Sequence, residues 1–230
     1  AGAQQYFDQG LILTYGFNHA EAVRSFREAQ RQDPKCAMAY WGEALALAPN
    51  INDPAIGPDR EKQGFAAIQR ALQLKNGTQP VEAALIDAMA RRYDGAEKPD
   101  RARLNQAYAE GMKAVYAAHP KDADVAVLYA DAVMNTMPWD YWSRDGKPRA
   151  GIPEIVKALQ TVLAEAPDHP GANHIYIHAV EASPDPDRAV AAADRLGGLV
   201  PGAGHLVHMP AHIRSEERRV GKECRSRWSP

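Results

Sequence analysis

The sequence predicts an all-α fold built from consecutive antiparallel helix pairs, and three observations support this. Apolar and small residues recur at helical spacing through most of the chain, and prolines close the periodic segments. Alanine is abundant while aromatic residues make up only 7%, which favours closely packed helices. One stretch also repeats at a spacing of 34 residues, typical of helix–turn–helix repeats. The matched positions are Pro167 and Pro201, His174 and His208, and His178 and His212.

The first predicted pair covers residues 4–34. Its first helix is followed by a tight turn at Gly16, Phe17 and Asn18, and its second helix ends at Pro34. Small residues on the facing sides of both helices would let the two helices approach closely. The positions that define this pair are, in order, Tyr6, Gly10, Leu13, Ala22, Phe26, Ala29 and Pro34.

Four further pairs follow the same plan. Their helices are expected at 39–48 with 59–74, 80–93 with 100–118, 122–136 with 152–166, and 170–182 with 186–199. Another helix is expected to begin at Gly202. Several pairs are longer than 34 residues, and the additional residues lie between the first and second helices. Insertions restricted to one kind of loop fall on one side of a repeat array, which is often its binding side.

The order of residues in the first pair resembles the tetratricopeptide repeat, which has an aromatic residue, Gly, Ala, an aromatic residue, Ala and a closing Pro. These are Tyr6, Gly10, Ala22, Phe26, Ala29 and Pro34. The resemblance covers about residues 1–213 and is degenerate in the middle. It implies a right-handed superhelical solenoid of antiparallel helix pairs, with long loops within the repeats.

Five segments are similar to a particular family of bacterial tetratricopeptide-repeat proteins. This family has no assigned activity. They are YGFNHAEAVRSF, AMAYWGEALALAPNIN, MPWDYW, HIYIHAVEASP and DRLGGLVPGAGHLVHMPAHI. This similarity implies a fold, but it does not imply a reaction. We therefore interpret the function from the residues themselves.

The resemblance implies that the first helix of each pair lines a concave groove. Such a groove would bind a peptide, a protein segment or a small ligand, and this is the first function hypothesis. The expected groove residues are Trp41, Asp87, Asp124, Asp131 and Asn135, together with Trp139, Tyr141 and Trp142 of the long loop. These loop aromatics could form a lid over the groove. Alternatively, they could hold the loop against the body of the protein.

Five of the eight histidines lie in the stretch from His174 to His212, and they suggest a second hypothesis. His174 and His178 are four residues apart, so they share one helix face, and an i,i+4 pair can place two imidazoles on one metal ion. His205, His208 and His212 also have helical spacing, and we expect one helix to carry them. The predicted metal-ligating set is His174, His178, Glu181, His205, His208 and His212.

The preferred quartet in this set is His174, His178, His208 and His212, with Glu181 as a ligand, as a hydrogen-bond partner of a ligating histidine, or as a base. Imidazole ligands suit Zn, Cu, Fe or Ni, so a metal-binding protein or metal-dependent enzyme is the alternative function. The same histidines could instead be polar groove lining, or core histidines with hydrogen-bonding partners. We expect His19, His119 and His169 to be cap or loop residues.

Residues 214–230 break the periodicity and resemble a translated sequencing adapter rather than part of the protein. Setting aside their six basic and three acidic residues leaves 21 basic and 26 acidic residues, a formal net charge of −5. This acidity argues against a nucleic-acid partner, and no apolar run is long enough to span a membrane. We also expect the natural protein to continue past Ile213. Because the sequence starts at Ala1, two localisations stay open for the protein: the bacterial cytoplasm and export.

Overall fold

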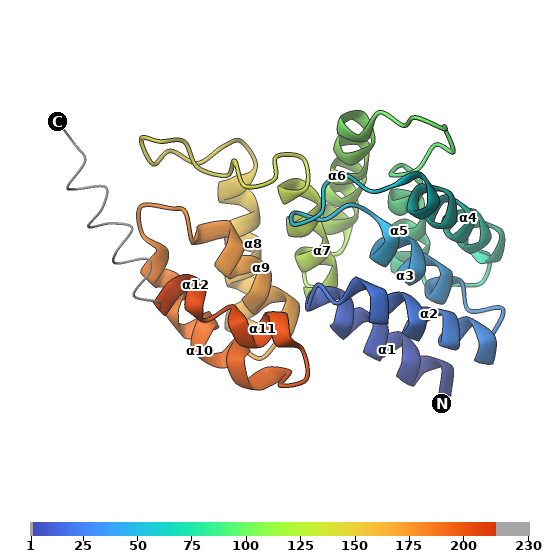
Figure 1. The fold of residues 1–230 in the computed structure, drawn as a ribbon, viewed down its shortest axis with the longest axis horizontal. Helices are drawn as coiled ribbons and strands as arrows, with labels where there is room; N and C mark the ends of the chain where they lie inside the picture. Colours follow the sequence, from blue (N-terminus) through green and yellow to red (C-terminus); the bar gives the residue numbers. More distant parts are fainter. Residues whose placement is uncertain (1, 215–230) are drawn as a thin grey trace.

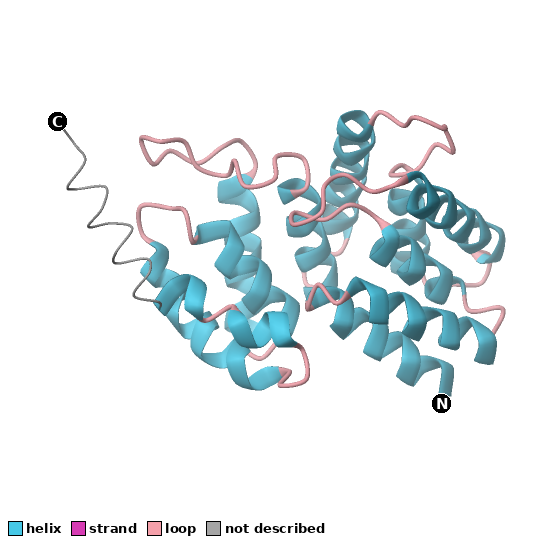
Figure 2. Ribbon diagram, in the orientation of Figure 1, coloured by secondary structure: helices cyan, strands magenta, loops and turns pink. Residues whose placement is uncertain are grey.

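The computed structural model describes residues 2–214, and this part of the chain is helical, with connecting loops and no strand (Figures 1 and 2). The all-α prediction is confirmed. The α-helices are α1 Gly2–Tyr15, α2 His19–Gln32, α3 Ala37–Leu47, α4 Pro58–Leu74, α5 Pro80–Ala90, α6 Arg101–Ala118, α7 Ala123–Met134, α8 Ile152–Glu165, α9 Pro170–Val180, α10 Val190–Leu199, α11 Gly204–His208 and α12 Ala211–Arg214. A 3-10 turn, Pro186–Ala189, precedes α10.

Helices that are consecutive in the chain pack against each other from α1 to α10. Contacts also join α1 with α3, α3 with α5, and α7 with α9, which are the first helices of neighbouring pairs. Such packing buries one large apolar core and a smaller separate cluster around Phe26. The core includes Trp41, Ile86, Met112 and Leu159, each almost fully buried.

The ends of several helices follow from local chemistry. Helices α4, α5, α8 and α9 carry a proline in their first turn, where the missing N–H costs nothing because it would have no helical partner. The Asp100 and Asp122 carboxylates cap α6 and α7 by accepting hydrogen bonds from the backbone N–H groups of Arg103 and Val125. These signals are readable in the sequence, which is why the helix positions could be predicted.

Two glycines let the first three helices approach closely around Phe26. A Cβ atom at Gly10 would lie 2.8 Å from the Phe26 ring, and one at Gly42 would lie 2.3 Å from it. Both distances are too short for a real side chain, so the fully buried Phe26 ring occupies the space that these glycines leave.

Contacts between α1 and α9 bring the first and fifth helix pairs together. The Tyr15 hydroxyl at the end of α1 donates a hydrogen bond of 2.5 Å to the Asp124 carboxylate on α7. The Tyr15 ring also lies against Gly171, where a Cβ atom would be 2.7 Å from it. The first helices of the pairs therefore surround a central region. The groove expected on this side is not open along its whole length.

The segment after Ala203 differs from the single helix that we expected. Helix α11 ends at His208, and the short α12 begins after Pro210. Proline has no N–H to donate, and its ring clashes with the preceding turn, so a continuous helix is interrupted there. His212 therefore belongs to a different helix from His205 and His208, although its ring still lies beside that of His208.

Arg214, the first residue of the predicted non-native tail, ends α12 and donates a hydrogen bond of 2.5 Å to Asp194. Residues 215–230 of that tail lie outside the described residues. Among residues 2–214, we find no helix with the length and apolar character needed to cross a membrane.

Candidate metal centre and the adjoining hollow

Three histidines from α9 and α11 form a compact cluster, which we call the histidine trio: His174, His178 and His205. One nitrogen from each of the three rings lies within 4.8 Å of the others. The Nε2 atoms of His174 and His205 are 3.0 Å apart. His174 and His178 are buried, while His205 is half-buried. This group could hold a metal ion.

The far side of each α9 histidine is held by a hydrogen-bond acceptor. Nδ1 of His174 lies 2.6 Å from the main-chain oxygen of Tyr15, and Nδ1 of His178 lies 2.9 Å from Oε1 of Glu181. A carbonyl oxygen can only accept, so Nδ1 of His174 carries the proton and Nε2 keeps its lone pair. Nε2 of His178 is buried and has no hydrogen-bond partner within residues 2–214.

Burial also keeps imidazoles of this cluster neutral. It lowers the pKa of His174 well below its usual value, and the nearby His178 and His205 add to this effect. Burial likewise lowers the pKa of His205 to about 4. Neutral imidazoles are the form that binds metal ions.

A second group surrounds Glu181. Its Oε2 atom lies 2.6 Å from Nδ1 of His212, and the outward Nε2 of His212 lies 3.0 Å from Nε2 of His208. Burial would raise the pKa of Glu181, but the hydrogen bonds from His178 and His212 outweigh it and lower the pKa to about 2. The hydrogen bond to Glu181 in turn raises the pKa of His212.

The six predicted ligands therefore come together, but not as the preferred quartet. His205 lies beside the α9 pair, whereas His208 is exposed and contacts the cluster's outer edge through His212. The second set of three potential ligands is His178, Glu181 and His212. His205 and His208 lie on α11, whereas His212 lies on α12 beyond Pro210.

Two aromatic residues enclose the trio: Phe17, which the sequence did not connect with the histidines, and Trp139 of the loop that was expected to form a lid. The Phe17 ring centroid lies 4.5, 6.0 and 5.2 Å from the rings of His174, His178 and His205, and Trp139 lies edge-on, 5.3 Å from His178. Phe17 and Trp139 have φ angles of 54° and 65°, and they are the positive-φ residues other than glycine within residues 2–214. Such conformations are costly for large side chains and often occur at functional sites.

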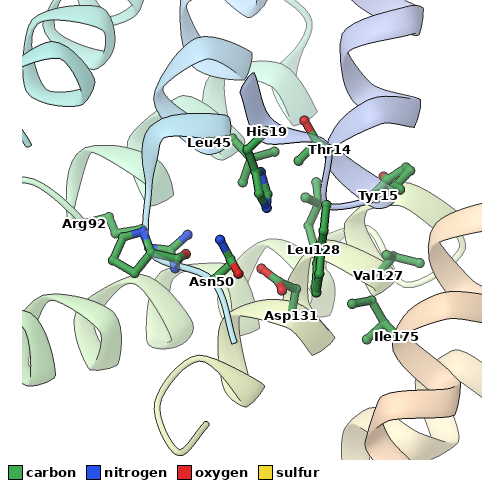
Figure 3. A pocket seen from close by; sticks show the side chains of 12 residues that line it. Thr14, Tyr15, His19, Leu45, Asn50, Arg92, Val127, Leu128, Asp131 and Ile175 are labelled. Atoms are coloured by element: carbon green, nitrogen blue, oxygen red, sulfur yellow. Dashed lines mark hydrogen bonds between the residues drawn. The ribbon is translucent and has the colours of Figure 1, made fainter. Parts of the chain in front are cut away.

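A hollow lies next to the trio (Figure 3). Residues of α1, α3, α7 and α9 line it, and so does Arg92, which follows α5. The space in it that a water-sized molecule can occupy is small, about 30 Å³. It is lined by Thr14, Tyr15, Phe17, His19, Leu45, Pro49, Asn50, Arg92, Val127, Leu128, Asp131 and Ile175.

A second, more open hollow shares part of this wall and extends it toward the trio. Its lining consists of Phe17, His19, Asn50, Asn52, Asp53, Arg60 and His205. Phe17, His19 and Asn50 belong to both hollows, so the two adjoin. His205 thus connects the histidine trio with this space.

The structure separates the residues expected to line one groove. Trp41 is buried and donates from Nε1 to the Leu85 carbonyl oxygen, at 3.2 Å. Asn135 is also buried, at the end of α7, and Asp87 is exposed and ion-paired with Lys75 at 2.6 Å. These positions therefore do not share one surface.

The two aspartates of α7 have different surroundings. Asp131 lines the hollow, while Asp124 accepts hydrogen bonds from Tyr15 and lies 3.2 Å from Nε2 of His169. Burial alone would raise the pKa of Asp124, but the hydrogen bonds from His169 and Tyr15 lower it. Asp124 thus helps to hold α1 against α7 and α9.

The loop aromatics are largely fixed by contacts with the body of the protein. Tyr141 is buried, and Trp142 donates from Nε1 to the Ala179 carbonyl oxygen at 2.8 Å. Trp139 remains half-exposed but donates to the Ile51 carbonyl oxygen at 2.8 Å. The loop is therefore attached to the body, and Trp139 alone of the three contacts the trio.

The remaining histidines only partly match the expected cap and loop roles. His169 caps α9 by accepting from the backbone N–H of Ala172, and His119 ends α6. His19, in contrast, lies in the first turn of α2 with its ring in the hollow. Its neighbour Asn18 precedes the helix.

Comparison with known proteins gives no match: no family model matches the chain, and no curated protein or solved structure is significantly similar to it. The functional proposal therefore depends on the geometry of the histidine trio and its surroundings.

Proposed function

We propose that this protein binds a transition metal ion through Nε2 of His174, His178 and His205. The observation that carries the proposal is the arrangement around α9. Two buried imidazoles have their Nδ1 atoms engaged by the Tyr15 carbonyl and the Glu181 carboxylate, which orients Nε2 for a ligand. Partners of this kind behind the ligating histidines are a recurrent feature of metal sites.

The distance between two of the trio's nitrogens suits an ion of moderate size. Imidazole nitrogens bind Zn at about 2.0–2.1 Å, so tetrahedral ligands lie roughly 3.3 Å apart. The observed 3.0 Å between Nε2 of His174 and Nε2 of His205 is close to this value. An N–H···N hydrogen bond between the two neutral rings has a similar length, so the proposal requires a direct measurement.

Three protein ligands would leave a further coordination position, as in catalytic zinc sites. His205 also lines the hollow, so this position would be accessible to a small molecule or water. We therefore extend the proposal to metal-dependent catalysis at this coordination position. Glu181 would act as a positioning residue that fixes the orientation of His178.

The test is elemental analysis of the protein purified without a histidine tag, before and after incubation with Zn²⁺. We expect about one equivalent of a transition metal in the wild type. His205→Ala should lose it, since one of three ligands is removed. His208→Ala is the matched control, because His208 is exposed and outside the trio, and it should retain the ion.

The opposite result would identify a different site. Loss of the ion in His208→Ala with retention in His205→Ala would favour the quartet that includes His208 and His212. No bound ion in the wild type after incubation with Zn, Cu, Fe or Ni would contradict metal binding. Circular dichroism of each variant checks that the helices are intact.

A scaffold whose groove binds a peptide or protein segment is the second candidate. The hollows beside His19 support it, because they are open to solvent and lie among the first helices. It has less support, because Trp41, Asn135 and Tyr141 are buried and unable to contact a peptide in this conformation. A pull-down that depends on hollow residues and not on metal would favour it.

For the fold, the finer proposal is a right-handed superhelix of degenerate tetratricopeptide-type pairs. Its support is the contact between successive first helices and the close approach of Gly10, Gly42 and Phe26. An experimental structure with helix pairs related by a constant right-handed rotation would bear this out.

A further inference from the structure

Two imidazoles outside the trio also face each other through ring nitrogens. His208 ends α11 and His212 lies on α12, and their Nε2 atoms are 3.0 Å apart. This separation equals the one between Nε2 of His174 and Nε2 of His205 in the trio. Nitrogen ligands of a tetrahedral ion lie roughly 3.3 Å apart, so a small displacement of these rings would admit an ion. We call His208 and His212 the outer pair.

Glu181 orients one member of the outer pair. Its Oε2 atom lies 2.6 Å from Nδ1 of His212. Burial opposes ionisation of Glu181, but the hydrogen bonds from His178 and His212 outweigh it and lower the pKa to about 2, so the carboxylate is ionised and can only accept. Nδ1 of His212 therefore carries the proton, and in the neutral ring the lone pair of Nε2 is directed at His208. A carboxylate behind a ligating histidine is a recurrent arrangement in metal sites.

The outer pair is accessible from solvent. His208 is exposed, and 25% of the His212 side chain is exposed. Two imidazoles leave the remaining coordination positions of an ion to water. An ion at the outer pair should therefore bind more weakly, and exchange more readily, than an ion held by the three ligands of the trio. Imidazole suits Zn, Cu and Ni, and Cu²⁺ should bind most tightly among these divalent ions.

Another combination of ligands lies nearby: His178, Glu181 and His212. The 2.6 Å between Oε2 of Glu181 and Nδ1 of His212 is typical of a short hydrogen bond to an ionised group, and it is well below the separation of two ligands of one ion. An ion there would also displace the Nδ1 protons of both histidines. The geometry therefore favours an ion on the outer side of His212, opposite Glu181.

We propose that Nε2 of His208 and Nε2 of His212 bind a second transition metal ion, with water in its remaining positions. This site adjoins the trio: the ring centroids of His205 and His208 are 6.4 Å apart, and those of His178 and His212 are 5.4 Å apart. Glu181 contacts His178 on one side and His212 on the other, so its negative charge offsets part of the repulsion between two dications. The site goes beyond the proposed function and does not require an ion in the trio.

The test is equilibrium dialysis of the protein, purified without a histidine tag, against increasing concentrations of free Zn²⁺. Bound Zn²⁺ is measured at each concentration without desalting, because desalting would remove a weakly held ion. The hydrogen bond to Glu181 raises the pKa of His212, so protons compete with the ion, and the dialysis is run at about pH 8. We expect the wild type to bind about two equivalents, the second at a higher free Zn²⁺ concentration than the first.

Three variants assign the two equivalents. His208→Ala removes a ligand of the outer pair, and because His208 is exposed the fold should be unaffected. It should keep the tightly bound ion and lose the weakly bound one. His205→Ala should do the reverse, since it keeps the outer pair and disrupts the trio. His119→Ala is the matched control, because His119 ends α6, and it should bind both ions like the wild type. Circular dichroism checks the helix content of each variant.

Two results would overturn the proposal. Equal binding by the wild type and His208→Ala over the whole Zn²⁺ range would mean that a hydrogen bond alone joins the outer pair. Equal loss of the second ion in His119→Ala and His208→Ala would mean that the weak binding is not specific to the outer pair.

Failure of the trio as a metal site would give a different pattern. The wild type and His205→Ala would then both bind one weakly held ion, and His208→Ala would bind none. That pattern would contradict metal binding by the trio and would still support the outer site.

Discussion

Phe17 shows how one residue links distant parts of the candidate site. Its ring contacts the three histidines of the trio and also stacks on His19, at 5.5 Å, so it separates the metal centre from the hollow. Its φ angle of 54° is unfavourable for a side chain of this size. The tight turn between α1 and α2 and the surrounding rings together hold this conformation.

Asp131 gives a pH-dependent prediction at the scale of a residue. Burial raises its pKa from the usual 3.8 to about 6, so the folded protein binds this proton more tightly than the unfolded chain does. Its contribution to the free energy of unfolding is therefore greatest below the lower value. That contribution falls as the pH rises from 3.8 to about 6.

Asp131→Asn should remove this dependence, because asparagine does not ionise. We expect the variant to gain stability relative to the wild type as the pH rises through this window, with no further change above it. Urea denaturation of both proteins at several pH values measures the difference. Parallel pH profiles for the two proteins would contradict the assigned role of burial.

At the scale of an element, the packing of α1, α2 and α3 depends on how closely Gly10 and Gly42 approach Phe26. Gly42→Ala would place a Cβ atom 2.3 Å from the Phe26 ring, which is fully buried and has little freedom to move. Overpacking of this kind typically costs about 1–3 kcal/mol. We expect a loss of that size in the free energy of unfolding.

Gly198→Ala is the matched control for this prediction. It lies in α10, and a Cβ atom there would meet nothing within 4 Å. Replacing a helical glycine with alanine typically stabilises a helix by about 0.5–1 kcal/mol. Chemical denaturation should therefore shift in opposite directions for the two variants, and equal shifts would show that the contact with Phe26 is unimportant.

At the scale of the whole molecule, the candidate site connects both ends of the described chain. His174 of α9 contacts the carbonyl of Tyr15 at the end of α1 and the ring of His205 on α11. An ion held by the trio would therefore strengthen the contacts that bring the first pair, the fifth pair and α11 together. The stabilisation by the ion should therefore extend to residues outside the ligand set.

We accordingly expect Zn²⁺ to raise the free energy of unfolding, by about 2.7 kcal/mol when free Zn²⁺ is a hundredfold above its dissociation constant. Backbone hydrogen exchange should slow in α11 and in the turn that contains Phe17. Hydrogen-exchange mass spectrometry with and without Zn²⁺ measures this change, and His205→Ala is the control that should show little of it. Unchanged exchange in α11 of the wild type would contradict the proposed ligand set.

Much of the helical architecture could be predicted from the sequence because helix formation depends on local signals. Prolines in first turns, capping aspartates and helical spacing of small residues mark the helix ends and packing faces. The pairing of His174 with His178 is equally local, since residues four apart share a helix face. The contact between His178 and Glu181 is also local, since the two residues are three apart in the chain.

The composition of the candidate site depended on contacts between residues far apart in the chain. Tyr15 and Phe17 meet His174 across more than 150 residues, and the hydrogen-bond partner of His174 Nδ1 is a main-chain oxygen, which no side-chain motif encodes. Tertiary packing brings His205 to His174 and His178, and brings His212 to His178 and Glu181, while His208 stays exposed. The convergence of His19, Arg92 and Asp131 likewise required the first helices to surround one space. Local periodicity thus determined the helices, whereas the closure of α1 onto α9 decided which polar groups share a buried site.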